Sequence, residues 1–85
     1  MIRILVAEDF ELIREDLCDV LNQQEDMTVV GSAASGKEIE ALALDNDFDL
    51  VLMDIEMETT TAGIQATEHI LAKKPYAKVR FLTAH

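Results

Sequence analysis

The sequence has few of the residues that crosslink small domains or anchor them in membranes. It contains one cysteine, Cys18, so no internal disulfide can form, and no other cysteine or histidine stands at the spacing of a zinc site. No apolar run approaches the roughly 20 residues of a membrane span or the apolar segment of a signal peptide. Because 85 residues are too few for two domains, we expect one cytoplasmic domain without a membrane partner.

Positive charge is also scarce. Seven lysines and arginines against seventeen aspartates and glutamates give a formal net charge of −10. A phosphate backbone or an anionic membrane surface would repel such a chain as a whole. We therefore expect that the domain does not bind nucleic acid itself, and that any contact with DNA would be made by a separate domain.

Four apolar segments predict strands, and the segments between them predict helices. The strands are expected at 2–7, 28–33, 50–53 and 79–85. The helices are expected at about 10–23, at 35–45, and between 62 and 73. This βαβαβαβ order, with connections of the length that parallel pairing needs, predicts a three-layer α/β/α sandwich around a parallel, doubly wound sheet.

The first two predicted helices have distinct signals. In the segment at about 10–23, the apolar residues recur at intervals of three and four and so share one face of a helix: Phe10, Ile13, Leu17, Val20 and Leu21. The charged residues fall mostly on the other face: Glu11, Arg14, Glu15, Asp16 and Asp19. The second helix opens with Ser35 and Glu38 at the spacing of a capping box and would turn three residues inward: Ile39, Leu42 and Ala43.

Acidic residues directly follow two of the predicted strands. Glu8 and Asp9 follow the strand at 2–7, and Asp54 follows the apolar strand at 50–53. The functional crevice of a parallel sheet lies at the carboxyl ends of its strands, near the point where the strand order reverses. Three carboxylates meeting there repel one another, and Mg²⁺ would relieve that repulsion. The pattern is that of a metal-assisted phosphoryl-transfer site, although Asp9 is also a candidate N-cap for the following helix.

Three motifs in order resemble the receiver domain of two-component response regulators. They are ILVAED at 4–9, VLMDIEM at 51–57 and VRFLTA at 79–84. The resemblance extends over essentially all 85 residues and implies a flavodoxin-like (CheY-like) fold. The run VGSAASG at 30–36 further resembles receivers attached to helix-turn-helix output domains of the LuxR/NarL type.

The resemblance implies a role for each residue that matches a motif. Asp54 would be the phosphoacceptor, taking a phosphoryl group from a sensor histidine kinase. Asp9 and Asp54 would bind Mg²⁺ together with the backbone carbonyl of Glu56, and Glu8 would act through a water. Thr83 would be the hydroxyl that turns toward the new phosphate. The domain would then be a switch for a DNA-binding output domain, not an enzyme.

Two features depart from the receiver pattern. After Asp54, receivers usually have a Met-Pro pair and a short loop to a glycine, whereas here Met57 precedes Glu58 and Gly63 follows one residue later than usual. The sequence also stops at His85, before the family's fifth strand and its phosphate-binding lysine. We therefore expect 1–85 to be a receiver domain truncated after its fourth strand. Such an exposed strand would favour a homodimer or other self-association.

Two other functions fit parts of the pattern. A degenerate receiver would act only as a docking or dimerisation module, and absence of Mg²⁺ affinity would favour it. A haloacid-dehalogenase-like phosphatase would use Asp54 and Glu56 in an approximate Asp-x-Asp motif, and sustained release of phosphate from a model ester would favour that enzyme.

Overall fold

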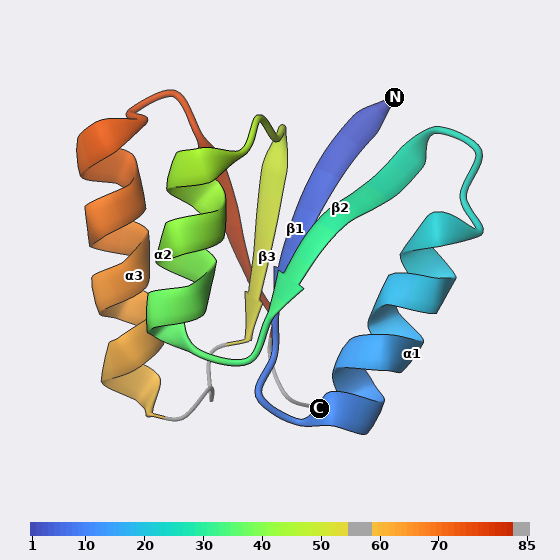
Figure 1. Ribbon diagram of the computed structural model, residues 1–85, viewed down its shortest axis with the longest axis horizontal. Helices are drawn as coiled ribbons and strands as arrows, with labels where there is room; N and C mark the ends of the chain where they lie inside the picture. The colour runs from blue at the N-terminus through green and yellow to red at the C-terminus, as the bar shows by residue number, and fades with distance from the viewer. Residues whose placement is uncertain (55–58, 83–85) are drawn as a thin grey trace.

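Strands and helices alternate along the whole described chain. The computed structural model describes residues 1–54 and 59–82. Its elements are β1 (Ile2–Ala7), α1 (Glu11–Asn22), β2 (Met27–Ala33), α2 (Gly36–Asp45), β3 (Leu50–Asp54), α3 (Thr60–Lys73) and β4 (Lys78–Leu82) (Figure 1). The predicted βαβαβαβ order is confirmed. None of the described helices is long and apolar enough to cross a membrane.

The four strands form one parallel sheet in the order β2-β1-β3-β4. The chain first winds from β1 to β2 on one side and then returns to place β3 and β4 on the other. The point where the strand order reverses therefore lies between β1 and β3. This is the doubly wound, CheY-like arrangement that the sequence predicted.

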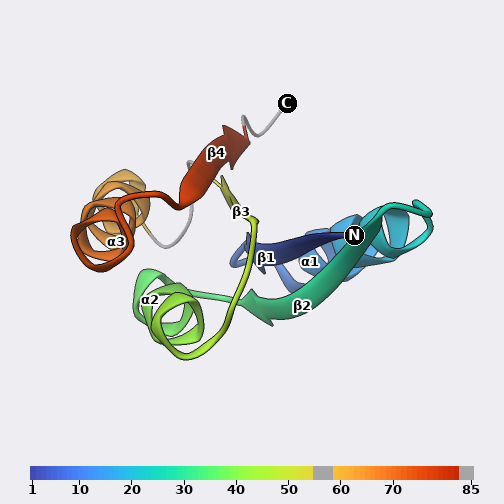
Figure 2. The same ribbon diagram turned by 90° about the horizontal axis from the view of Figure 1, so that it is seen from above.

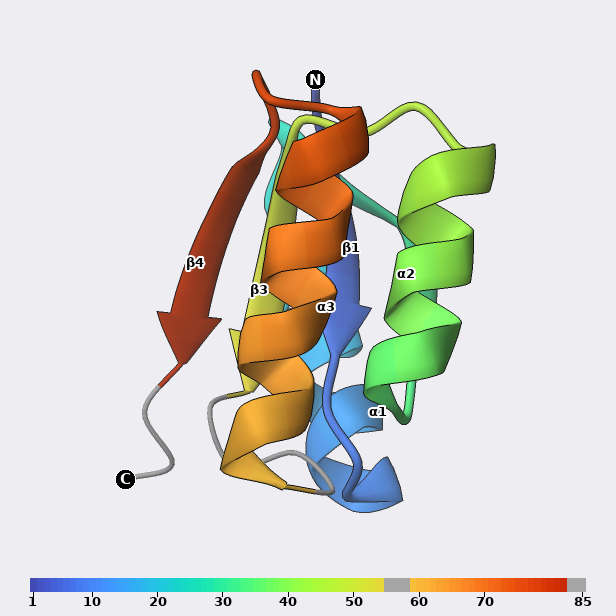
Figure 3. The same ribbon diagram turned by 90° about the vertical axis from the view of Figure 1, so that its left-hand side faces the viewer.

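One face of the sheet is covered by α2 and α3, which lie side by side (Figure 3). The core cluster lies at this face, and its buried members come from three strands and both helices: Leu5, Ala7, Ala33, Ile39, Ala43, Val51, Met53, Ala66 and Ile70. The predicted capping box also forms, since Ser35 Oγ accepts from the Glu38 amide at 3.2 Å and Glu38 accepts from the Ala34 amide. A Cβ on Gly36 would lie 3.0 Å from the Ala62 carbonyl oxygen, so glycine permits the close approach of the two helices.

On the other face, α1 is much less buried than its periodicity indicated. No residue of α1 is fully buried, and Phe10, Ile13 and Val20 are each more than half exposed. The helix packs mainly against β2, which is an edge strand, so only a narrow side of it is covered (Figure 2). Arg14, expected on the charged outer face, is half-buried instead. The reason is that its guanidinium Nη1 donates to the Glu8 carbonyl at 2.9 Å.

Several element boundaries differ from the sequence prediction, most by a single residue. Helix α3 begins at Thr60, before the expected end of the loop, because Thr59 Oγ1 accepts from the Ala62 amide at 2.9 Å and caps the first turn. Strand β4 begins one residue earlier than expected, at Lys78. The end of the expected strand, at 83–85, lies outside the described residues.

Candidate functional site

Three carboxylates meet at the carboxyl edge of the sheet. Strands β1 and β3 are parallel neighbours, and Ala7 at the end of β1 pairs with Met53, the residue before Asp54. Both strands therefore bring the residues at their ends to the same place. Glu8, Asp9 and Asp54 each offer a carboxylate oxygen, and these oxygens lie within 4.8 Å of one another. The predicted meeting of the three acidic residues is confirmed.

The members of this acidic cluster differ in burial. Glu8 and Asp54 are each only 6% exposed, whereas Asp9 is exposed to solvent. Burial, a hydrogen bond with Asp54 and the negative charge of Asp54 together raise the pKa of Glu8 to about 7. Glu8 therefore holds its proton to a higher pH than an ordinary glutamate does. The site crowds like charges where water cannot fully screen them.

Backbone contacts fix the end of β1 in this crowded position. The Glu8 amide donates to the Ala33 carbonyl of β2 at 3.0 Å, and the Phe10 amide donates to Glu8 Oε1 at 3.3 Å. The alternative role of Asp9 as a helix cap is not observed, because Phe10 is the N-cap of α1 and no side chain caps it. The Asp9 carboxylate thus remains in the cluster.

The arrangement suits a small, hard, divalent cation. Three carboxylates around a common point supply oxygen ligands and negative charge, which Mg²⁺ prefers, and the exposed side at Asp9 leaves room for water or a phosphate. Two residues to which the resemblance gave roles, Glu56 and Thr83, lie outside the described residues. The geometry therefore bears on Glu8, Asp9 and Asp54 only.

The contact of Arg14 with the site was missed by the sequence analysis. Its guanidinium holds the backbone carbonyl of Glu8 and brings a positive charge next to the acidic cluster. The residues beside it in α1 are mostly acidic or exposed, and helical spacing alone placed it on the outer face. No local signal in the sequence marks this contact.

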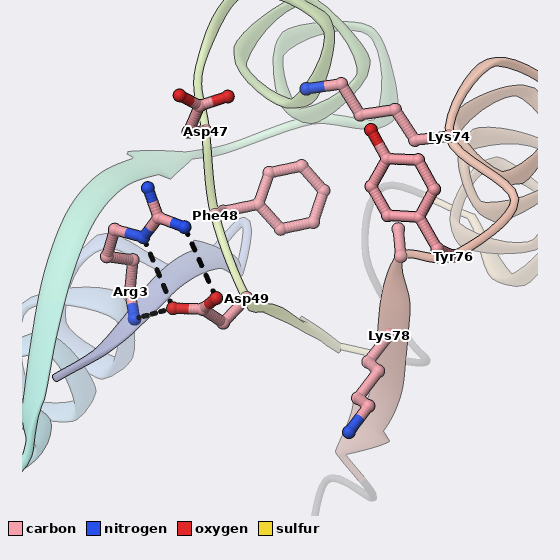
Figure 4. A pocket seen from close by; sticks show the side chains of 8 residues that line it. Arg3, Asp47, Phe48, Asp49, Lys74, Tyr76 and Lys78 are labelled. Carbon is pink, nitrogen blue, oxygen red and sulfur yellow. Dashed lines mark hydrogen bonds and ion pairs between the residues drawn. The ribbon is translucent and has the colours of Figure 1, made fainter.

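A cavity of about 350 Å³ lies at the opposite, amino edge of the sheet (Figure 4). Arg3 and Asp49 form a two-pronged ion pair there, with Nε and Nη2 each 3.3 Å from a carboxylate oxygen. Lys74 Nζ donates to the Asn46 carbonyl at 2.8 Å and lies 5.1 Å from the centre of the Phe48 ring. Arg3 and Asp49 thus neutralise each other in this cavity, whose lining also contains Asp47, Lys74 and Lys78.

Comparisons with known proteins agree with the fold and the site. The family model for the response regulator receiver domain matches residues 4–85. The transcriptional regulatory protein YxjL of Bacillus subtilis is 42% identical over 82 residues, covering 96% of this chain and 37% of YxjL. The response regulator VraR of Staphylococcus aureus is 41% identical over 83 residues, covering 98% of this chain and 39% of VraR.

A solved structure shows the same likeness in three dimensions. The response regulator TrrA of Thermotoga maritima, in complex with Mg²⁺-BeF, matches with a TM-score of 0.85 and 37% identity, covering 100% of this chain and 71% of TrrA. The chain spans well under half the length of the curated relatives that it matches. Its acidic cluster lies at the site where phosphorylation is expected in this family. The chain therefore belongs to the receiver domains of two-component response regulators, which are signalling modules rather than turnover enzymes.

Proposed function

We propose that Asp54 accepts a phosphoryl group from a phosphohistidine of a sensor histidine kinase, with Mg²⁺ held beside it. The observation that carries this proposal is the position of Asp54. It ends a buried strand, is almost fully buried itself, and has two further carboxylates within 4.8 Å. A nucleophilic carboxylate and a cation site are thereby joined in one place.

In the proposed reaction, a carboxylate oxygen of Asp54 attacks the phosphorus atom. The bond between phosphorus and the kinase histidine nitrogen breaks, and the electron pair leaves with that nitrogen. Asp9 and Asp54 would hold the Mg²⁺ together with the Glu56 carbonyl, and Glu8 would act through a water. When bound, the cation neutralises the charge that would otherwise repel an incoming phosphoryl group.

Glu8 has a further part in this proposal. Because its pKa is near 7, Glu8 can hold a proton that reduces the repulsion among the three carboxylates when no cation is present. A cation and this proton compete for the same carboxylates, so cation binding releases the proton. The buried position of Glu8 thus makes the charge of the site adjustable near neutral pH.

The proposed effect of phosphorylation is exerted on an output domain that lies outside this chain. Thr83 is proposed as the hydroxyl that turns toward the phosphate and passes the change to the surface. YxjL is a transcriptional regulatory protein, so we propose that the phosphorylated domain acts in the cytoplasm and controls a DNA-binding output domain. The chain itself, with a net charge of −10, would not contact DNA.

The test is intact mass after incubation with Mg²⁺ and acetyl phosphate. The wild-type chain is expected to gain one phosphoryl group, and Asp54→Ala is expected to gain none. Asp49→Ala is the matched control, because Asp49 is an aspartate just before the same strand but at its other end. It should be phosphorylated like the wild type. Unchanged uptake by Asp54→Ala, or no uptake by the wild type, would contradict the proposal.

The docking-module alternative keeps one observation in its favour, the exposed apolar side of α1. It predicts neither phosphoryl uptake nor Mg²⁺ binding, so the same experiment separates the two functions. The phosphatase alternative loses its basis, because the family match identifies a signalling module.

A further inference from the structure

The turn between β1 and α1 carries Asp9, the one exposed member of the acidic cluster (Figure 1). Asp54 is fixed by its place at the end of a buried strand, and Glu8 is buried and accepts a hydrogen bond from the Phe10 amide. No hydrogen bond from the residues that the structure describes, 1–54 and 59–82, holds the Asp9 carboxylate. The position of Asp9 therefore depends on how the backbone on either side of it is held.

Arg14 contacts the backbone on both sides of Asp9. Its guanidinium Nη1 donates to the Glu8 carbonyl at 2.9 Å, and its own amide donates to the Phe10 carbonyl at 2.9 Å. The chain from Glu8 to Arg14 is thereby closed into a loop that contains Asp9. The Arg14 side chain is half-buried, so water competes less for the Glu8 carbonyl and the hydrogen bond is stronger than at an open surface.

The Glu8 carbonyl is part of the peptide unit that joins Glu8 to Asp9. The six atoms of a peptide unit, including both α-carbons, lie close to one plane. The Glu8 amide, in the preceding peptide unit, is fixed separately by its hydrogen bond to the Ala33 carbonyl at 3.0 Å. A hydrogen bond that holds the carbonyl oxygen therefore restricts rotation of the following plane, and with it the direction in which the Asp9 side chain leaves the backbone.

Helix α1 also starts differently from the other two described helices. Ser35 caps α2 and Thr59 caps α3, each by accepting a hydrogen bond from an amide of the first turn. The N-cap of α1 is Phe10, whose side chain makes no cap hydrogen bond. Arg14 supplies a contact of another kind, because it donates from the helix back to Glu8. This contact ties the start of α1 to the backbone at the end of β1.

We propose that Arg14 is a positioning residue for the cation site: by holding the Glu8 carbonyl, it keeps the Asp9 carboxylate beside the other two carboxylates. This inference rests on the proposed function, since it takes Asp9 as a ligand of Mg²⁺. The role requires no contact between Arg14 and the cation. A ligand that is already in place binds more tightly, because less conformational freedom is lost on binding.

The positive charge of Arg14 acts in the opposite direction. A fixed positive charge beside a cation site repels Mg²⁺. If Arg14 contributed only its charge, its removal would therefore strengthen Mg²⁺ binding. If Arg14 positions Asp9, its removal weakens Mg²⁺ binding. The sign of the change in affinity thus separates the two roles.

The test is a titration of the chain with Mg²⁺, followed by the amide NMR signals of Asp9 and Phe10. Arg14→Met keeps most of the length of the side chain but removes its charge and its donors. It should raise the dissociation constant for Mg²⁺ about tenfold, the scale on which residues that orient metal ligands act. Arg14→Lys keeps the charge and a donor that can reach the Glu8 carbonyl, so it should restore most of the affinity.

Two further measurements accompany the titration. The carbonyl ¹³C signal of Glu8 reports the hydrogen bond itself, and it should move upfield in Arg14→Met and return toward the wild-type position in Arg14→Lys. Lys37→Met is the matched control, because Lys37 is an exposed cation in the first turn of α2, which also begins at the carboxyl edge. It should leave the dissociation constant for Mg²⁺ unchanged or lower it. Circular dichroism of each variant verifies folding.

A double-mutant cycle with Asp9→Asn tests whether Arg14 acts through Asp9. In the Asp9→Asn background, Arg14→Met should no longer weaken Mg²⁺ binding, because the carboxylate that Arg14 positions is gone. Unchanged or tighter binding by Arg14→Met alone, or equal weakening in both backgrounds, would overturn this inference and leave the proposed function intact. A wild type that binds no Mg²⁺ would overturn the proposed function and this inference together.

Discussion

The two ends of strand β3 carry the same kind of residue in opposite circumstances. At the amino edge, Asp49 is exposed and paired with Arg3, which holds the pKa of that carboxyl below its usual range. At the carboxyl edge, Asp54 is buried beside Glu8, and burial together with the hydrogen bond and negative charge of Asp54 raises the pKa of Glu8 to about 7. The first aspartate has a cationic partner, whereas the second lies in a cluster with two other carboxylates. A cluster of carboxylates of this kind is what a divalent cation can bind.

The amino-edge cavity differs from the acidic cluster in its chemistry. Its lining holds the ion pair between Arg3 and Asp49, a hydrogen bond from Lys74 to a backbone carbonyl, and a contact of Lys74 with the Phe48 ring (Figure 4). The acidic cluster instead brings three carboxylates together, which is the donor set that a divalent cation prefers.

The largest expected effect on stability is a pH dependence that comes from the carboxyl edge. The pKa of Glu8 is raised from 4.5 to about 7 in the folded chain, so between these values the folded state holds more protons than the unfolded state. The free energy of unfolding therefore falls as pH rises from about 4.5 to about 7, by up to about 3 kcal/mol in total. It stays at this lower value above about pH 7. Urea unfolding from pH 5 to 8 in EDTA measures this fall.

Glu8→Gln is the variant that isolates this effect. The glutamine stays neutral, so its unfolding free energy should lack most of the decline between pH 5 and 8. Glu8→Gln should be more stable than the wild type at pH 8 but not at pH 5. An equally steep decline in Glu8→Gln would mean that the pH dependence does not arise from crowding at the carboxyl edge.

A smaller effect is expected from Mg²⁺. A cation that binds only the folded chain should stabilise it by about 1.4 kcal/mol at ten times its dissociation constant. Thermal melts at pH 8 with and without Mg²⁺ measure this gain. Asp9→Asn should lose most of it, whereas Asp49→Asn should keep it, because the amino edge holds no part of the cluster. Equal loss in both variants would remove the distinction between the edges.

The smallest effect is expected at the amino edge itself. Asp49→Asn removes the ion pair with Arg3, in which both side chains are exposed to solvent. The substitution is therefore expected to lower the melting temperature by less than about 4 °C. Because salt screens exposed pairs, the difference from the wild type should shrink further in 1 M NaCl. A large, salt-independent loss would show that Asp49 acts mainly through the hydrogen bond that it accepts from the Arg3 amide at 2.7 Å.

The sequence predicted most of the fold and the centre of the site. Apolar strands separated by helix-length segments constrain the sheet to be parallel, and acidic residues after the first and third strands then converge at one edge. Ile39 and Ala43 turned inward as predicted, because the face they meet is fully closed.

The remaining features depend on packing that no local pattern encodes. Helical spacing showed that one side of α1 is apolar but not how much of it the sheet would cover, so Ile13 and Val20 are more exposed than expected. Arg14 lies inward because its guanidinium donates a hydrogen bond to the backbone carbonyl of Glu8, which precedes the helix. The pKa of Glu8 depends on burial depth and on a residue distant in sequence.

The parallel pairing of β1 with β3 also has a consequence for how the molecule is made. Neither strand can pair until the whole of α1, β2 and α2 has been synthesised between them, and no local hairpin is available as a first step. Closing such long loops slows folding relative to a helical bundle of the same size. Glu8 and Asp54 meet only when that step is complete. The acidic cluster therefore exists only in molecules in which β1 and β3 have already paired, and a nascent chain that has not reached this step lacks it.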